Sequence, residues 1–169
     1  MTNPVLEAIY RRRSVRHFTA DDVSLDELRE IVKAGIWAPS GLNNQPWRFV
    51  LIRDRQTRGR LAEQTKYKQV VLAAPALIAV YLDRNTMYDE VKDHQAAGAC
   101  IENMLLAAEA LGLGAVWLGQ ILKNKEEVRR ILALEDHLDL MAVIALGRPA
   151  PGERSSQRKP LEEFILKIF

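Results

Sequence analysis

The chain has 169 residues, the size of one ordinary domain, with 48% hydrophobic and 27% charged residues and a formal net charge of only +2. This near balance of charge argues against a long polyanion such as nucleic acid as the partner, and the single cysteine, Cys100, excludes an internal disulfide. No run of residues is long and apolar enough to span a bilayer, and the N-terminus lacks the apolar core of a signal peptide. We therefore expect a cytoplasmic protein without a membrane partner.

The first half of the chain predicts helices and strands in alternation. Asn3 followed by Pro4 is typical of a helix start, and the helix should run to about Arg12. Ser24 with a glutamate three residues later forms a capping box, and the helix that follows should end before Pro39. The remaining elements of this half are a strand at 48–53, a helix at 57–72 and a continuous apolar strand at 76–82.

A long helix over 87–111 opens the second half, and its last part is apolar nearly all round. Gln95, Glu102 and Glu109 recur every seven residues and leave one narrow polar stripe. Such a helix is buried on most sides, and a second subunit is the expected cover. The later elements are a short strand or turn at 115–119, a helix at 124–134, a strand at 140–147, and a loop or arm that leads to the apolar end LEEFILKIF. Mixed helices and strands indicate a layered α/β or α+β domain.

Three polar segments interrupt this core-like chain, at 12–16, 38–47 and 154–159. Arginines and a serine just after a helix end suit a phosphate group, although a solvated helix end explains segment 12–16 equally well. Segment 38–47 offers a row of hydroxyl and amide groups, or is an ordinary turn with Trp47 in the core. Segment 154–159 alone is typical of a linker. Cys100 lies among apolar residues and is interpreted as a buried small side chain rather than a catalytic thiol.

Taken together, four segments resemble the FMN-dependent nitroreductase family in order and rough spacing: IYRRRSVRHFT, APSGLNNQPWRFVLI, GLGAVWLGQ and IALGRPAPGERSSQRKPLEEF. The resemblance implies an α+β fold of three layers (α/β/α), in which helices flank a mixed, mainly antiparallel sheet. It implies an obligate homodimer with FMN at the subunit interface. Residues 1–169 then form a single FMN-binding domain, with 150–169 as a C-terminal arm that packs on the partner subunit. The chain is short for this family, so insertions that build a lid are missing or small.

The resemblance also implies the cofactor contacts, position by position. Arg12, Arg13 and Ser14 correspond to contacts with the phosphate and ribityl chain, and Arg16 to a basic residue at the pyrimidine edge of the flavin. The backbone that lies along the flavin corresponds to Trp117, Leu118 and Gly119. One of residues 66–69 should contact the pyrimidine edge of the flavin. In the family, further contacts come from the other subunit, and here they correspond to Pro39, Ser40, Asn43 and Gln45. The family also has late basic residues that contact the phosphate, and these correspond to Arg158 and Lys159. No catalytic side chain and no metal is implied, because the flavin carries the chemistry.

The function implied by the resemblance is an oxidoreductase. It takes hydride from NADH or NADPH to flavin N5 and passes the electrons to a nitroaromatic compound, a quinone or a similar small oxidant. Three alternatives stay open: another flavin enzyme of the superfamily (a metabolite-specific reductase, oxidase or dehalogenase), a flavin-holding protein without turnover, and, less favoured, a nucleic-acid-binding module with a basic arm. The sequence does not choose between NADH and NADPH.

Overall fold

The structure is a computed structural model that describes residues 3–152 and 155–169. Its centre is a sheet of four strands, β1 (Trp47–Ile52), β2 (Ala76–Asp83), β3 (Gly114–Leu118) and β4 (Leu138–Gly147), in the order β1-β2-β4-β3. Each pair of neighbouring strands is antiparallel. The segment after the first helix adds one isolated parallel bridge, between Ser14 and Ala115 on the outer edge of β3.

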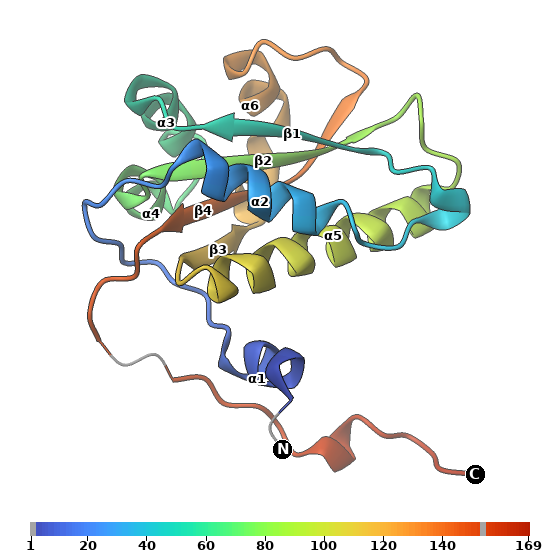
Figure 1. Ribbon diagram of the computed structural model, residues 1–169. Helices are drawn as coiled ribbons and strands as arrows, with labels where there is room; N and C mark the ends of the chain where they lie inside the picture. The colour runs from blue at the N-terminus through green and yellow to red at the C-terminus, as the bar shows by residue number, and fades with distance from the viewer. Residues whose placement is uncertain (1–2, 153–154) are drawn as a thin grey trace.

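Helices cover both faces of this sheet (Figure 1). Helices α2 (Leu25–Gly35) and α5 (Glu90–Ala110) pack on one face, whereas α3 (Arg55–Ala62), α4 (Lys68–Ala73) and α6 (Lys125–Ile131) pack on the other. Every residue of β2 is buried, since this strand is central and covered on both sides, which explains its continuous apolar run. The expected three-layer α/β/α architecture is confirmed.

The local signals at helix starts are confirmed in detail. The side chain of Asn3 accepts hydrogen bonds from the backbone N–H groups of Val5 and Leu6 at the start of α1 (Pro4–Arg11). At α2, the N–H of Glu27 donates to Ser24 Oγ at 3.2 Å while the N–H of Ser24 donates to Glu27 Oε2 at 2.9 Å. These two reciprocal bonds are the capping box that the sequence predicts.

The single helix expected over 57–72 is wrong, because the chain leaves the helix after Ala62 and re-enters one at Lys68. The side chain of Gln120, more than 50 residues farther along the chain, stabilises this break. Oε1 of Gln120 accepts hydrogen bonds from Thr65 Oγ1 at 2.7 Å and from the N–H of Lys66 at 2.8 Å. The N–H of Lys66 donates to this distant side chain instead of to a helix carbonyl, so α3 and α4 remain separate.

Helix α5 packs closely on α2 as well as on the sheet. At Gly35 the two helices approach so closely that an added Cβ would lie 2.6 Å from Cγ of Met104. Cys100 is buried in the same contact, and burial raises the pKa of its thiol to about 12. The interpretation of Cys100 as an inert core residue is confirmed, since the reactive thiolate is disfavoured there.

The C-terminal segment leaves the body of the molecule after β4. Residues 155–169 are exposed throughout and include one short turn of helix at Leu161–Glu163. In Figure 1 this segment runs past α1 and away from the sheet. Within the described residues, none of the helices combines the length and the apolar composition that a membrane span needs.

Candidate functional site

The basic segment after α1 is fixed against the edge of the sheet. The N–H of Val15 donates to the carbonyl of Ala115 on β3 at 2.9 Å, next to the bridge between Ser14 and Ala115. Val15 packs on Gly114, where an added Cβ would lie 2.6 Å from Val15 Cγ1, so glycine is what allows this close approach. The side chains that follow α1 are therefore held beside β3.

A cavity of about 280 Å³ lies at this junction. Both ends of the chain contribute to it. Its lining residues are Arg12, Arg13, Ser14, Arg16, Ser155, Ser156 and Arg158. Guanidinium groups and hydroxyls are donors to anionic oxygens, and among the residues that the structure describes no carboxylate belongs to this lining. We call these seven residues the cationic cradle. Its donor set fits a phosphate group.

The cradle arginines are partly engaged within the chain. Arg12 Nε donates to Glu102 at 3.2 Å, and Arg13 Nη1 donates to the carbonyls of Tyr10 and Arg12 at 2.6 and 2.8 Å. Nε of Arg13 is buried and has no partner among the described residues. A buried donor without an acceptor is costly, so this atom also fits a site that a ligand completes.

Arg158 and Lys159 were both predicted to contact the phosphate, but only Arg158 lies at the cradle. Arg158 lines the cradle, and its Nη1 donates to Ser156 Oγ at 3.1 Å. Lys159 does not line it, because its Nζ pairs with Glu163 at 3.0 Å. Arg154, from the same polar segment of the sequence, lies outside the described residues. Arg16 lines the cradle, where its Nη1 lies 3.4 Å from the carbonyl of Ser14.

The edge strand β3 continues from the cradle through Trp117 and Leu118 to Gly119. Trp117 is 41% exposed and Leu118 is buried. Gln120, the next residue, holds Thr65 and Lys66, so the segment 66–69 lies at the far end of β3. The cradle and segment 66–69 therefore lie at opposite ends of β3, and we call the cradle, this strand edge and segment 66–69 together the strip.

The loop with Pro39, Ser40, Asn43 and Gln45 is not part of this strip. Nδ2 of Asn44 donates to Asp93 near the start of α5, whereas Arg12 contacts Glu102 nine residues farther along that helix, about 13 Å away. Within one chain the loop and the cradle are therefore separate. That the loop serves the partner's site stays a prediction.

Backbone strain is concentrated in the same loop. Leu42, Asn43 and Gln45 have φ values of 54°, 55° and 46°. These left-handed conformations are costly for residues other than glycine and cluster at functional segments. Inside the loop, Ser40 Oγ accepts from the N–H of Gln45 at 3.1 Å, which helps to stabilise its shape.

Sequence reasoning missed the residue that anchors this loop. The carboxylate of Asp93 is fully buried and accepts three hydrogen bonds, from Asn44 Nδ2 at 2.8 Å and from the N–H groups of Tyr88 and Asp89 at 2.9 and 3.1 Å. Burial by itself raises the pKa of Asp93, but these hydrogen bonds outweigh it and lower the pKa. In the sequence, Asp93 is simply an acidic residue early in a helix, so it carries no distinguishing signal.

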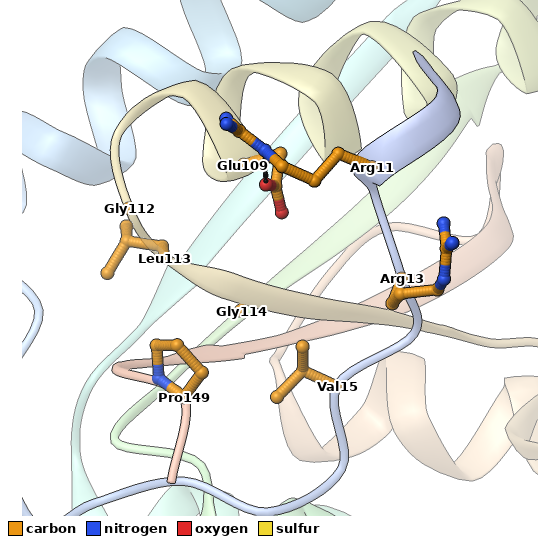
Figure 2. Close-up of a pocket in the computed structure, with 8 residues that line it drawn as sticks. All are labelled: Arg11, Arg13, Val15, Glu109, Gly112, Leu113, Gly114 and Pro149. Carbon is orange, nitrogen blue, oxygen red and sulfur yellow. Dashed lines mark hydrogen bonds and ion pairs between the residues drawn. The ribbon is translucent and has the colours of Figure 1, made fainter. Parts of the chain in front are cut away.

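A second cavity, of about 330 Å³, shares Arg13 with the cradle, and Figure 2 shows the residues that line it. Figure 2 shows Arg11 reaching from the end of α1 to Glu109 on α5, and the ion pair between them measures 2.7 Å. In the sequence, Glu109 is recognisable only as part of the polar stripe of α5. In the structure, Glu102 and Glu109 of this stripe both hold arginines of the basic segment.

The chain matches a family model described as "Nitroreductase family" over residues 9–66 and 61–148. An NADH dehydrogenase of Thermus thermophilus is 34% identical to it, with 98% of each chain covered. An NAD(P)H-dependent FMN reductase of Bacillus subtilis is 24% identical and covers 95% of this chain and 72% of its own length. A predicted nitroreductase of Desulfovibrio desulfuricans, crystallised in complex with FMN, is 52% identical over 99% of this chain and 98% of its own, with a TM-score of 0.95.

Proposed function

Because the chain belongs to the nitroreductase family, we propose that it is an FMN-dependent oxidoreductase that oxidises NADH or NADPH and reduces a small oxidant such as a nitroaromatic compound or a quinone. The cationic cradle at the edge of β3 is the observation that carries the proposal. It has four guanidinium groups and three hydroxyls at one end of a strip of backbone, with the size and chemistry for a phosphate on a longer flat ligand.

The proposed task of the cradle is to hold the phosphate of FMN. A phosphate monoester carries about −1.5 to −2 charges at neutral pH, which two or three arginines balance. Arg12, Arg13, Ser14 and Arg158 are the proposed contacts, with Lys159 joining them once the arm is packed. The outer edge of β3 at Trp117, Leu118 and Gly119 is proposed to lie along the ring system, since an edge strand presents unpaired backbone groups.

Bound FMN supplies the electron-transfer chemistry, and the protein supplies position and charge. Arg16 is proposed to place its positive charge near the pyrimidine edge, and one of residues 66–69 to contact the same edge from the far end of β3. No side chain is assigned as a proton donor or acceptor.

We further propose that the active unit is a homodimer. Apolar side chains are exposed along α1, at Trp37, which is 81% exposed, and over most of 161–169. A groove of about 530 Å³ runs between α1, α2 and α5, and its lining is mostly apolar. Such continuous apolar surface is typical of an interface. A second copy would cover it, pack against arm 150–169 and bring Pro39, Ser40, Asn43 and Gln45 to the first copy's flavin.

Purification tests the proposal directly. The protein should be yellow, should release FMN rather than FAD on denaturation, and should oxidise NADH or NADPH in the presence of nitroaromatics or quinones. Steady-state rates with each nicotinamide, against a panel that also contains free flavin and halogenated aromatics, separate a nitroreductase from other flavin enzymes of the superfamily. A colourless protein that does not take up added FMN would contradict the proposal.

A further inference from the structure

We propose that Glu102 is a positioning residue of the cationic cradle: it holds one edge of the Arg12 guanidinium so that the opposite edge faces the bound anion. This inference rests on the proposed binding of FMN phosphate at the cradle. It assigns a task to an acidic residue of the long helix α5, a residue that neither the motifs nor the lining of the cavity includes.

The geometry of the pair supports this task. Arg12 Nε lies 3.2 Å from Glu102 Oε1, and the pair joins the segment after α1 to the middle of α5. A guanidinium group has five N–H donors in one plane, with a single one on Nε and four on the two Nη atoms. A carboxylate on Nε therefore leaves the Nη edge for a phosphate. The Arg12 side chain is only 21% exposed, so its body is already confined.

A second ion pair between α1 and α5 provides the comparison. Arg11 Nε lies 2.7 Å from Glu109 Oε1, one heptad further along the same stripe. The Arg11 side chain is 69% exposed and does not line the cradle. The two pairs share their chemistry and both dock the basic segment on α5, but only the pair with Glu102 includes a cradle residue.

Two effects of Glu102 on a bound phosphate oppose each other. Its negative charge repels the phosphate, and its hold on Arg12 removes conformational freedom that binding would otherwise have to remove. The Glu102 side chain is 43% exposed, so water and salt screen the repulsion. Orientation of Arg12 should therefore dominate, and Glu102 should favour anion binding although it is acidic.

The test compares FMN with riboflavin, which has the same ring system and no phosphate. Both dissociation constants are measured by flavin fluorescence on apoprotein prepared from the purified holoprotein. Glu102→Ala should raise the dissociation constant of FMN about five- to tenfold and leave that of riboflavin within about twofold, since one long side chain loses its fixed orientation. Glu102→Gln keeps an acceptor oxygen and should stay within about threefold of wild type for FMN.

Two further variants isolate the path through Arg12. Glu109→Ala, the matched control, should leave both dissociation constants unchanged. In an Arg12→Ala background, Glu102→Ala should cause no additional loss of FMN affinity, because the residue through which it acts is gone.

Four results would overturn the inference: Glu102→Ala binding FMN as tightly as wild type or more tightly, equal losses for FMN and riboflavin, Glu102→Gln losing as much as Glu102→Ala, or an equal effect of Glu109→Ala. These are distinct from a failure of the proposed function. In that case the wild-type protein itself would bind no FMN, or would bind FMN no better than riboflavin.

Discussion

Three consecutive arginines at the end of α1 have three different environments. Arg11 pairs with Glu109, Arg12 pairs with Glu102, and Arg13 turns back to the carbonyls at the end of α1. The helix ends between the first and the second, so the side chains leave in different directions. Three identical residues in a row therefore make different contacts, and the sequence alone does not show which arginine makes which contact.

Arg16 leads to a prediction about the redox properties of the flavin. A cation near the pyrimidine edge stabilises the negative charge that the ring gains on reduction. Arg16→Ala should therefore lower the two-electron reduction potential by about 30 mV, the equivalent of one charge interaction near a protein surface. The potential is measured by equilibrium titration against a reference dye, with Arg11→Ala as the control. An unchanged potential in Arg16→Ala would place this residue away from the ring.

At the scale of elements, α5 organises both halves of the proposed site. Its middle turns hold Arg12 of the cradle through Glu102, and its first turns hold the strained loop through Asp93. A helix with 21 residues spans about 30 Å, enough to place these two groups far apart on one rigid body. The polar stripe that the sequence shows is thus a set of anchoring points as well as an exposed surface.

Asp93 leads to a prediction about stability and pH. Its pKa in the folded protein is lowered from the ordinary value of 3.8, so its carboxylate stabilises the fold above that pH and the contribution is lost as the pH falls through the folded pKa. Asp93→Asn should lower the free energy of unfolding at pH 7 by about 2 kcal/mol, through lost hydrogen bonds to a charged acceptor. Urea unfolding at pH 7 and pH 4.5 should show the same difference, which shrinks below pH 3.8.

The control for this prediction is Asp26→Asn, because Asp26 is an exposed carboxylate that pairs with Arg29 on the surface of α2. Its effect should stay within about 0.5 kcal/mol. If Asp93→Asn matched Asp26→Asn at pH 7, the buried carboxylate would not be the anchor of the loop.

At the scale of the whole molecule, a large part of the apolar surface has no cover in one chain. Leu166 and Phe169 at the C-terminus are almost completely exposed, and so is Trp37 near the start of the strained loop. These residues lie outside the two core clusters that surround the sheet. The protomer can therefore bury its sheet alone, and these residues belong to the surface that the proposed second copy would cover.

Truncation after Pro160 tests the role of the arm. The nine residues that are lost are exposed in the protomer, so the circular dichroism spectrum should not change. If the arm packs on the partner, its loss should raise the dissociation constant of the dimer about tenfold or more, as measured by sedimentation velocity over a range of concentrations. An unchanged dissociation constant would show that the arm does not contribute to the interface, and a monomeric full-length protein would contradict the homodimer.

How far the sequence predicts the fold depends on the range of the interactions. The starts of α1 and α2 are predicted from Asn3 and from the capping box of Ser24, because those bonds join residues two or three positions apart. The helix expected over 57–72 is wrong because its break is stabilised by Gln120, far along the chain. The same limit applies to the site: motifs name Arg12, Ser14 and Arg158, whereas Glu102 and Asp93 emerge only from contacts across the fold.

The amino-acid sequence by itself determined the helix caps, the alternation of helices and strands, the buried central strand and the cationic segments near both ends. Each of these follows from the properties of neighbouring residues, which act over a few positions. Only the tertiary structure decided that the two cationic segments meet in one cavity, that a carboxylate on α5 contacts Arg12, and that the strained loop is held at a different part of α5, nine residues or about 13 Å before that carboxylate. Those arrangements arise from contacts between residues that lie some 50 to 130 positions apart: α5 holds Arg12 and Asn44, and the bridge between Phe18 and Pro149 brings the two cationic segments to the same side of the sheet.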